Sequence, residues 1–198
     1  MTNRLLKFLG RYQKNEHGVA AVEFALVSPI LFMLLLGGVE VGRYILVHQK
    51  VEKMAYSVSD IVSQMEAVTS GDVDVIFGAA TELMNPYDEY ETRVTLFLSS
   101  VHKDPDDADQ IIRWQCQGGG SLTAESVVGD PTSGGGVAAL PGSLALEDDD
   151  NVIVSEAFYT YKPILGWYTI QNITVYKSAM FRPRLGALTS APGCPTGV

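Results

Sequence analysis

The sequence has little positive charge. Only 14 lysines and arginines stand against 23 aspartates and glutamates in 198 residues, which gives a formal net charge of −9. Neutralising the phosphates of a duplex needs clustered cations, so an acidic chain is a poor candidate for a nucleic-acid-binding protein. We therefore expect no nucleic acid among its partners.

Residues that build metal and catalytic sites are also scarce. Two cysteines and three histidines cannot form a four-ligand Cys/His zinc site at any usual spacing. There is no H-E-x-x-H, no G-x-S-x-G and no phosphate-binding loop. The acids between Asp104 and Asp109 lack the EF-hand spacing, so they are expected to form a solvated turn and not a calcium site. We predict no enzymatic activity, no catalytic residue, no cofactor and no metal site.

A long apolar run near the N-terminus dominates what the sequence does contain. The run Val19–Val39 carries a single charge and would span roughly 31 Å as a helix, the thickness of a bilayer core. Residues 1–18 hold four cations against one acid, which predicts a cytoplasmic N-terminus and an external C-terminal body. The run is too long for a signal peptide and no small-residue cleavage site follows it, so we expect it to remain with the protein.

Glu23 is the one charge inside this run. A carboxylate near the end of a membrane helix costs several kcal/mol unless it reaches the interface or is paired. Its position leaves two interpretations open, a tolerated interfacial acid or a functional residue. Because ionisable residues inside a membrane usually have a function, the second interpretation is favoured.

The neighbours of Glu23 carry a resemblance. The stretch from Gly18 through Val19 and Ala20 to Glu23 and Phe24 is similar to the cleavage region of type IV prepilins. With Pro29 and the G-x-x-E-x-G-R-Y exit that follows the run, the segment over about residues 15–65 resembles the TadE-like family of the tight-adherence (Tad, or Flp) pilus system. The resemblance implies that prepilin peptidase cuts between Gly18 and Val19. It also implies that Glu23 then pairs with the N-terminal ammonium of a neighbouring subunit.

The function implied by the resemblance is that of a minor pilin or pseudopilin, a structural or assembly component of a Tad pilus. Its implied partners are prepilin peptidase, the major pilin, other pseudopilins, the inner-membrane assembly platform and membrane lipid. Its implied location is the bacterial inner membrane, with a periplasmic C-terminal domain and possible entry into the extracellular filament. The alternative is an uncleaved single-pass inner-membrane protein whose external domain binds a partner. An envelope hydrolase would be a third class, but no motif supports it.

Four segments follow from these patterns: a leader over 1–18, a membrane span over 19–39, a helical continuation over 40–66 and an α+β domain over 71–198.

Pro29 predicts a kink near Ala25–Ser28. Gly38 and Gly42 form a G-x-x-x-G pair, which either allows close helix packing or has no special role. The continuation carries an apolar seam at helical spacing, composed of Val47, Val51, Met54, Val58, Ile61 and Met65.

The remainder predicts a pilin-like α+β fold. Ser70-Gly71 is expected to break the long helix, and Asp72 to begin a short second helix that ends at Asn85-Pro86. Alternation then predicts four strands of an antiparallel sheet, at Arg93–Ser100, Ile111–Gln117, Val152–Tyr161 and Ile170–Phe181. Between the middle two lies a Gly-rich loop over 118–150, which is either a functional surface or poorly ordered. Outside the cytoplasm, Cys116 and Cys194 would form a disulfide.

Overall fold

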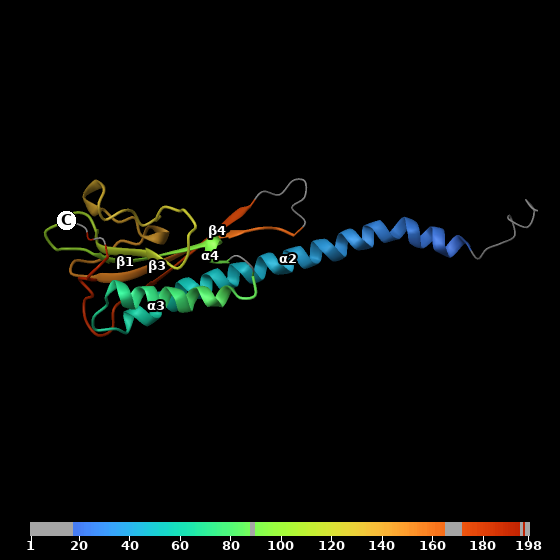
Figure 1. The fold of residues 1–198 in the computed structure, drawn as a ribbon. Coiled ribbons are helices and arrows are strands. Elements are labelled where there is room, and N and C mark those ends of the chain that lie inside the picture. Colours follow the sequence, from blue (N-terminus) through green and yellow to red (C-terminus); the bar gives the residue numbers. More distant parts are fainter. Residues whose placement is uncertain (1–17, 88–89, 165–171, 195, 197–198) are drawn as a thin grey trace, which may run out of the picture. The chain divides into compact units, whose positions relative to one another are not determined.

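The computed structural model describes residues 18–87, 90–164, 172–194 and 196. The chain divides into two compact units, Met1–Arg43 and Tyr44–Val198, and helix α2 (Val19–Ser63) contributes to both (Figure 1). The predicted leader lies outside the described residues, apart from Gly18.

The described part of the first unit is the apolar half of α2. Its large side chains are exposed on every side of the helix, for example Phe24 at 65% and Met33 at 76%. By length and composition, α2 is a candidate membrane span. The helix continues through Pro29, which has no N–H to offer the carbonyl of Ala25. The hydroxyl of Ser28 donates to that carbonyl at 3.3 Å, so the group freed by the proline keeps a hydrogen bond.

The second unit is built on a four-stranded antiparallel sheet. Its strands are β1 (Val94–His102), β2 (Ile111–Gly118), β3 (Asn151–Tyr161) and β4 (Ile173–Phe181), in the spatial order β2-β1-β3-β4. The predicted α+β class, with a long helix, a short helix and four antiparallel strands, is confirmed. The predicted start of the last strand at Ile170 lies outside the described residues.

One face of the sheet, here called the inner face, is covered by the second half of α2. The predicted seam is correct at Val47, Val51, Met54 and Val58, which are fully buried. It is wrong at Ile61, which is exposed, because Val62 lies one full turn after Val58 and takes the buried position.

Polar contacts fix the position of this half of α2 on the sheet. The hydroxyls of Ser59 and Ser155 lie 3.1 Å apart in the core, and Ser155 also donates to the carbonyl of Ala55. At the sheet edge, Lys177 of β4 pairs with Glu52 at 3.4 Å. Because these buried hydroxyls are hydrogen-bonded, they set the helix register without an unpaired polar group.

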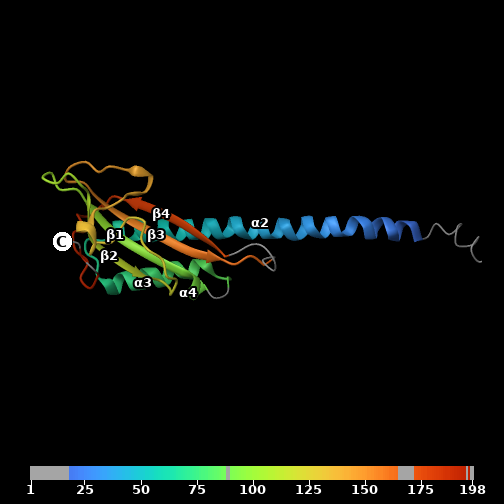
Figure 2. The same ribbon diagram turned by 90° about the horizontal axis from the view of Figure 1, so that it is seen from above.

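Helix α3 (Ser70–Thr81) lies beside α2 on the same face of the sheet (Figures 1 and 2). The predicted break between the long and the short helix is confirmed, but it lies at residues 64–69, because Ser70 and Gly71 belong to the first turn of α3. The start is set by Thr69, whose hydroxyl accepts from the N–H of Asp72 while the Asp72 carboxylate accepts from the Thr69 N–H. This reciprocal capping box satisfies two helix-end donors and outweighs the low helix propensity of Ser and Gly. The Thr69 hydrogen bonds also lower the pKa of Asp72.

The C-terminal end of the α3 segment is fixed by a lysine of α2. After α3 the chain forms the 3-10 turn η2 (Glu82–Met84), and α4 (Tyr90–Arg93) precedes β1. The ammonium of Lys50 donates to the carbonyls of Leu83 at 2.5 Å and Asn85 at 2.7 Å. A cation at this end supplies donors to carbonyls that the helix leaves without partners.

The Gly-rich segment 118–150 covers part of the opposite, outer face of the sheet. It contains the 3-10 turns η3 (Gly134–Gly136) and η4 (Pro141–Ser143). Its apolar residues close a second core with residues of the outer face, formed by Val101, Ile112, Val128, Ala138, Leu140, Leu146, Val152 and Val154. The segment is therefore packed against the sheet and is not poorly ordered, and its use as a functional surface stays a prediction.

A disulfide joins Cys116 of β2 to Cys194 in the C-terminal tail, with Cα atoms 5.0 Å apart and a sequence separation of 78. Both residues belong to the inner-face core, where the tail also contributes Leu188 and Ala191. The bond therefore holds a segment without regular secondary structure against the sheet.

Replacing both cysteines by serine should lower the free energy of unfolding by about 4 kcal/mol, because the open chain regains the entropy of a long loop. Urea unfolding of the full chain in detergent micelles, followed by tryptophan fluorescence, measures this loss. Treatment of the unaltered chain with a reductant is the control and should reproduce it. An unfolding free energy unchanged in both experiments would contradict a structural role for the bond.

Candidate functional site

The segment from Gly18 to Phe24 forms the first turns of α2 and the residue before them. Gly18 is exposed, and a Cβ added to it would meet no atom within 4 Å. Val19 is the first residue of the helix. Glu23, one turn further on, is exposed and makes no hydrogen bond or ion pair in the part of the chain that is described. The structure thus places the predicted cleavage and assembly residues together in the first turns of α2 and the residue before them.

The G-x-x-x-G pair lies on one face of α2. Gly38 and Gly42 are one turn apart, and a Cβ at either position would meet nothing within 4 Å. Within the described residues nothing fills the space that these glycines leave, and another helix could approach closely there.

In the second unit, Glu156 is a fully buried carboxylate on the outer face of β3. It accepts from the hydroxyl of Ser126, from the N–H of Val127 at 2.9 Å and from the hydroxyl of Tyr176 at 3.0 Å. Three donors make burial of this charge tolerable, and two of them come from the Gly-rich segment. Glu156 therefore anchors that segment on the sheet.

The same contacts act on the phenol of Tyr176. Burial raises its pKa, and the nearby negative charge of Glu156 raises it further. The phenol consequently stays protonated and donates to the carboxylate.

Gln115 of β2 forms a second anchor for the Gly-rich segment. Its amide donates to the hydroxyl of Ser126 at 3.0 Å and to the carbonyl of Gly129 at 3.1 Å. The φ of Gly129 is +125°, a conformation that favours glycine. In this conformation the carbonyl of Gly129 accepts the hydrogen bond from Gln115.

Next to these anchors, the segment leaves a hollow of about 610 Å³ over β1 and β2. Its floor holds Phe97, Gln115 and Gln117, and its walls carry the exposed carboxylates of Glu125 and Asp130. Hydrogen bonds from Thr132 lower the pKa of Asp130, so the wall carries negative charge at neutral pH. The volume is within the range of small-ligand sites, and the lining is more polar than is usual for them.

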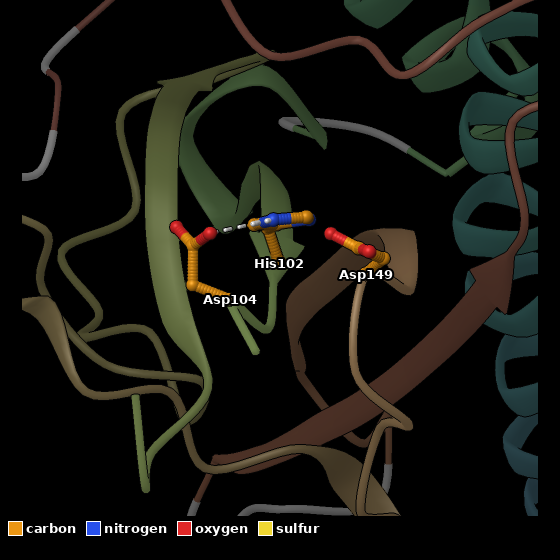
Figure 3. Close-up of side chains that lie close together, drawn as sticks. All are labelled: His102, Asp104 and Asp149. Carbon is orange, nitrogen blue, oxygen red and sulfur yellow. Dashed lines mark ion pairs between the residues drawn. The ribbon is translucent and has the colours of Figure 1, made fainter. Parts of the chain in front are cut away.

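A third group lies at the end of β1. There, His102, Asp104 and Asp149 place their ligand atoms within 4.8 Å of one another (Figure 3). No metal site was predicted here, because Asp149 is far from the other two residues in sequence. The predicted solvated turn is correct for Asp106, Asp107 and Asp109, which are exposed, but Asp104 is held by Arg113 at 2.7 Å.

Sequence reasoning also missed Glu156. The signal was present, since Glu156 is the only charged residue in the otherwise apolar and polar-neutral strand β3. A lone carboxylate inside a strand whose neighbours are apolar indicates a buried, hydrogen-bonded group.

A comparison with known protein families finds a match in the N-terminal part of the chain. The model of the TadE-like protein family matches residues 18–59, in agreement with the resemblance found in the sequence. No curated protein matches the chain. No solved structure matches it either.

Replacing Glu156 by alanine should lower the free energy of unfolding by about 2–4 kcal/mol, because three donors lose a buried acceptor. The amide of Val127 should also exchange its hydrogen faster. Urea unfolding and hydrogen exchange measure the two effects. Glu125→Ala removes an exposed carboxylate of the same segment and should change stability by less than about 0.5 kcal/mol. Equal effects of the two substitutions would sink the anchoring role.

Proposed function

We propose that this chain is the precursor of a minor pilin or pseudopilin of a Tad pilus, cleaved by prepilin peptidase between Gly18 and Val19. The observation that carries the proposal is the TadE-like match over residues 18–59, which relates the chain to Tad pilus proteins and begins at the proposed cleavage glycine. The exposed Gly18, directly before the first residue of α2, supports it.

Cleavage at this point has a clear chemical consequence. It removes the cations of residues 1–18 and frees an ammonium group at Val19, at the N-terminal end of an apolar helix. Glycine suits the cleavage position because it has no side chain to keep a peptidase away from the backbone. The product is a helix whose positive terminus and first carboxylate, Glu23, both lie close to its N-terminal end.

Glu23 would then act in assembly. An unpaired carboxylate among packed apolar helices is costly, whereas one paired with an ammonium group costs much less. We infer that Glu23 meets the Val19 ammonium of a neighbouring subunit and so fixes the axial register between them. Gly38 and Gly42 would allow the two helices to approach closely at their other end.

The proposed organisation has a cytoplasmic leader over 1–18, a membrane span over 19–39, a helical continuation over 40–66 and a periplasmic domain over 71–198. The proposed partners are prepilin peptidase, the major pilin, other pseudopilins and the inner-membrane assembly platform. In this arrangement the second unit is the part presented outside the membrane, and it either enters the filament or aids its assembly.

One observation favours a second candidate function. The hollow over β1 and β2 is large enough for a small polar ligand. An uncleaved, membrane-anchored protein with an external binding domain would use such a site and would not need the cleavage at Gly18.

Expression with an active prepilin peptidase should yield a chain that begins at Val19, and expression with an inactive peptidase should yield the full chain. Intact mass and N-terminal sequencing of the membrane-extracted protein decide between them. Gly18→Val should block cleavage, because a branched side chain stands where the peptidase must approach the backbone. Gly10→Val, a matched change within the leader, should leave cleavage intact. A chain that keeps residues 1–18 with active peptidase would instead support the anchored binding protein.

Glu23→Gln should still be cleaved but should no longer assemble, because a neutral amide cannot pair with the Val19 ammonium. The measurement is the fraction of the protein that is recovered with sheared pili or cross-linked to other pilins. Unchanged recovery of the Glu23→Gln chain would contradict the proposed pairing and leave the cleavage proposal standing.

A further inference from the structure

Two acidic segments that are distant in sequence meet at one corner of the second unit. One follows β1 and the other precedes β3. The N–H of Asp149 donates to the carbonyl of Lys103 at 2.9 Å, and the N–H of Lys103 donates to the carbonyl of Asp150 at 3.1 Å. This backbone pairing places the Asp149 side chain beside His102, the last residue of β1.

The three side chains converge on a common point. In Figure 3 the imidazole of His102 lies between the carboxylates of Asp104 and Asp149, which approach it from two sides. The Nε2 atom of His102 is 4.0 Å from Oδ1 of Asp104, and all three ligand atoms lie within 4.8 Å of one another. Ligands bound to one small cation at about 2.0–2.2 Å are about 3.4 Å apart in tetrahedral geometry. Small rotations of the three side chains would therefore bring their ligand atoms to coordination distance of one ion.

The pattern of ion pairs around this group leaves one acid free. Three of the neighbouring acids have a cation partner: Asp104 with Arg113 at 2.7 Å, Asp148 with Lys103 at 3.1 Å and Asp150 with Arg182 at 2.6 Å. Asp149 has no ion pair or side-chain hydrogen bond in the described part of the chain. Arg113 binds Oδ2 of Asp104 and leaves Oδ1 directed at His102, as an outer-shell group orients a metal ligand.

His102 supplies an independent observation. Its side chain is only 12% exposed, and Nδ1 is buried without a hydrogen-bond partner. Nε2 is too far from Asp104 to form a hydrogen bond. Its cross-strand neighbour Asn151 is 7% exposed and has an unpartnered Nδ2. The nitrogen that faces Asp104 is therefore Nε2, which makes no hydrogen bond within the described residues and keeps its lone pair available to an ion.

We propose that His102, Asp104 and Asp149 bind a divalent transition cation of the zinc type. One imidazole nitrogen and two carboxylate oxygens form a donor set suited to zinc, and the two carboxylates neutralise its charge. Water would complete the coordination. The ion would tie the end of β1 to the segment that precedes β3, next to the two backbone hydrogen bonds and the Lys103–Asp148 ion pair that already join them.

Isothermal titration of the untagged full chain in detergent micelles with Zn²⁺ tests this site. We expect one ion per chain and a rise in Tm on binding. His102→Gln and Asp149→Asn should each weaken Zn²⁺ binding by about tenfold or more and abolish the rise in Tm. Asp149 is exposed, so its variant should fold like the unaltered chain in the absence of metal.

Asp107→Asn is the matched control, since Asp107 is an exposed acid of the same turn outside the group. It should bind Zn²⁺ like the unaltered chain. Three results would overturn the proposal: no Zn²⁺ binding, Zn²⁺ affinity unchanged in Asp149→Asn, or Ca²⁺ binding as tight as Zn²⁺ binding and unaffected by His102→Gln. None of these results bears on cleavage at Gly18.

Discussion

Packing of one side of α2 against the inner face of the sheet is the interaction on which the second unit depends. Four side chains of α2 are fully buried there: Val47, Val51, Met54 and Val58. The contact between Ser59 and Ser155 fixes the position of the helix along the sheet. Helix α3, the disulfide and the C-terminal tail all complete the same core. Helix α3 depends on this core, because an isolated helix of 12 residues is marginal in water.

The outer face of the sheet is organised by polar groups as much as by apolar ones. Its apolar cluster covers the half of the sheet near the end of β1 and the start of β3, whereas Glu156 and Gln115 bind the Gly-rich segment further along. A segment with many glycines buries little apolar surface per residue and has more backbone entropy to lose. Directed hydrogen bonds to a buried carboxylate compensate for that deficit, and they leave the adjacent hollow lined by polar side chains.

The features that could be predicted from the sequence are those encoded by local spacing. The apolar run, the helical seam and the alternating strands each repeat within one element, so the α+β class followed from them. Errors arose where a tertiary or capping contact overrides local propensity. The capping box of Thr69 and Asp72 admits Ser70 and Gly71 into a helix, and the position of the sheet selects Val62 over Ile61. The role of Glu156 needed the knowledge of which loop lies above β3, which no local pattern contains.

The two proposed sites differ in how much of each can be found from the sequence alone. The proposed cleavage and assembly residues Gly18, Val19 and Glu23 are close together in the sequence, so a local pattern can suggest their relation. The TadE-like match over residues 18–59 confirms the family resemblance of the segment that holds them, and their roles stay a proposal. His102 and Asp104 offer only two ligands, which alone is no metal motif. The third, Asp149, comes beside them because β1 and β3 are antiparallel neighbours, and the chain segments at their adjacent ends are brought together. A site assembled from the ends of two strands is a property of the sheet topology, and it can be found only once the strand order is known.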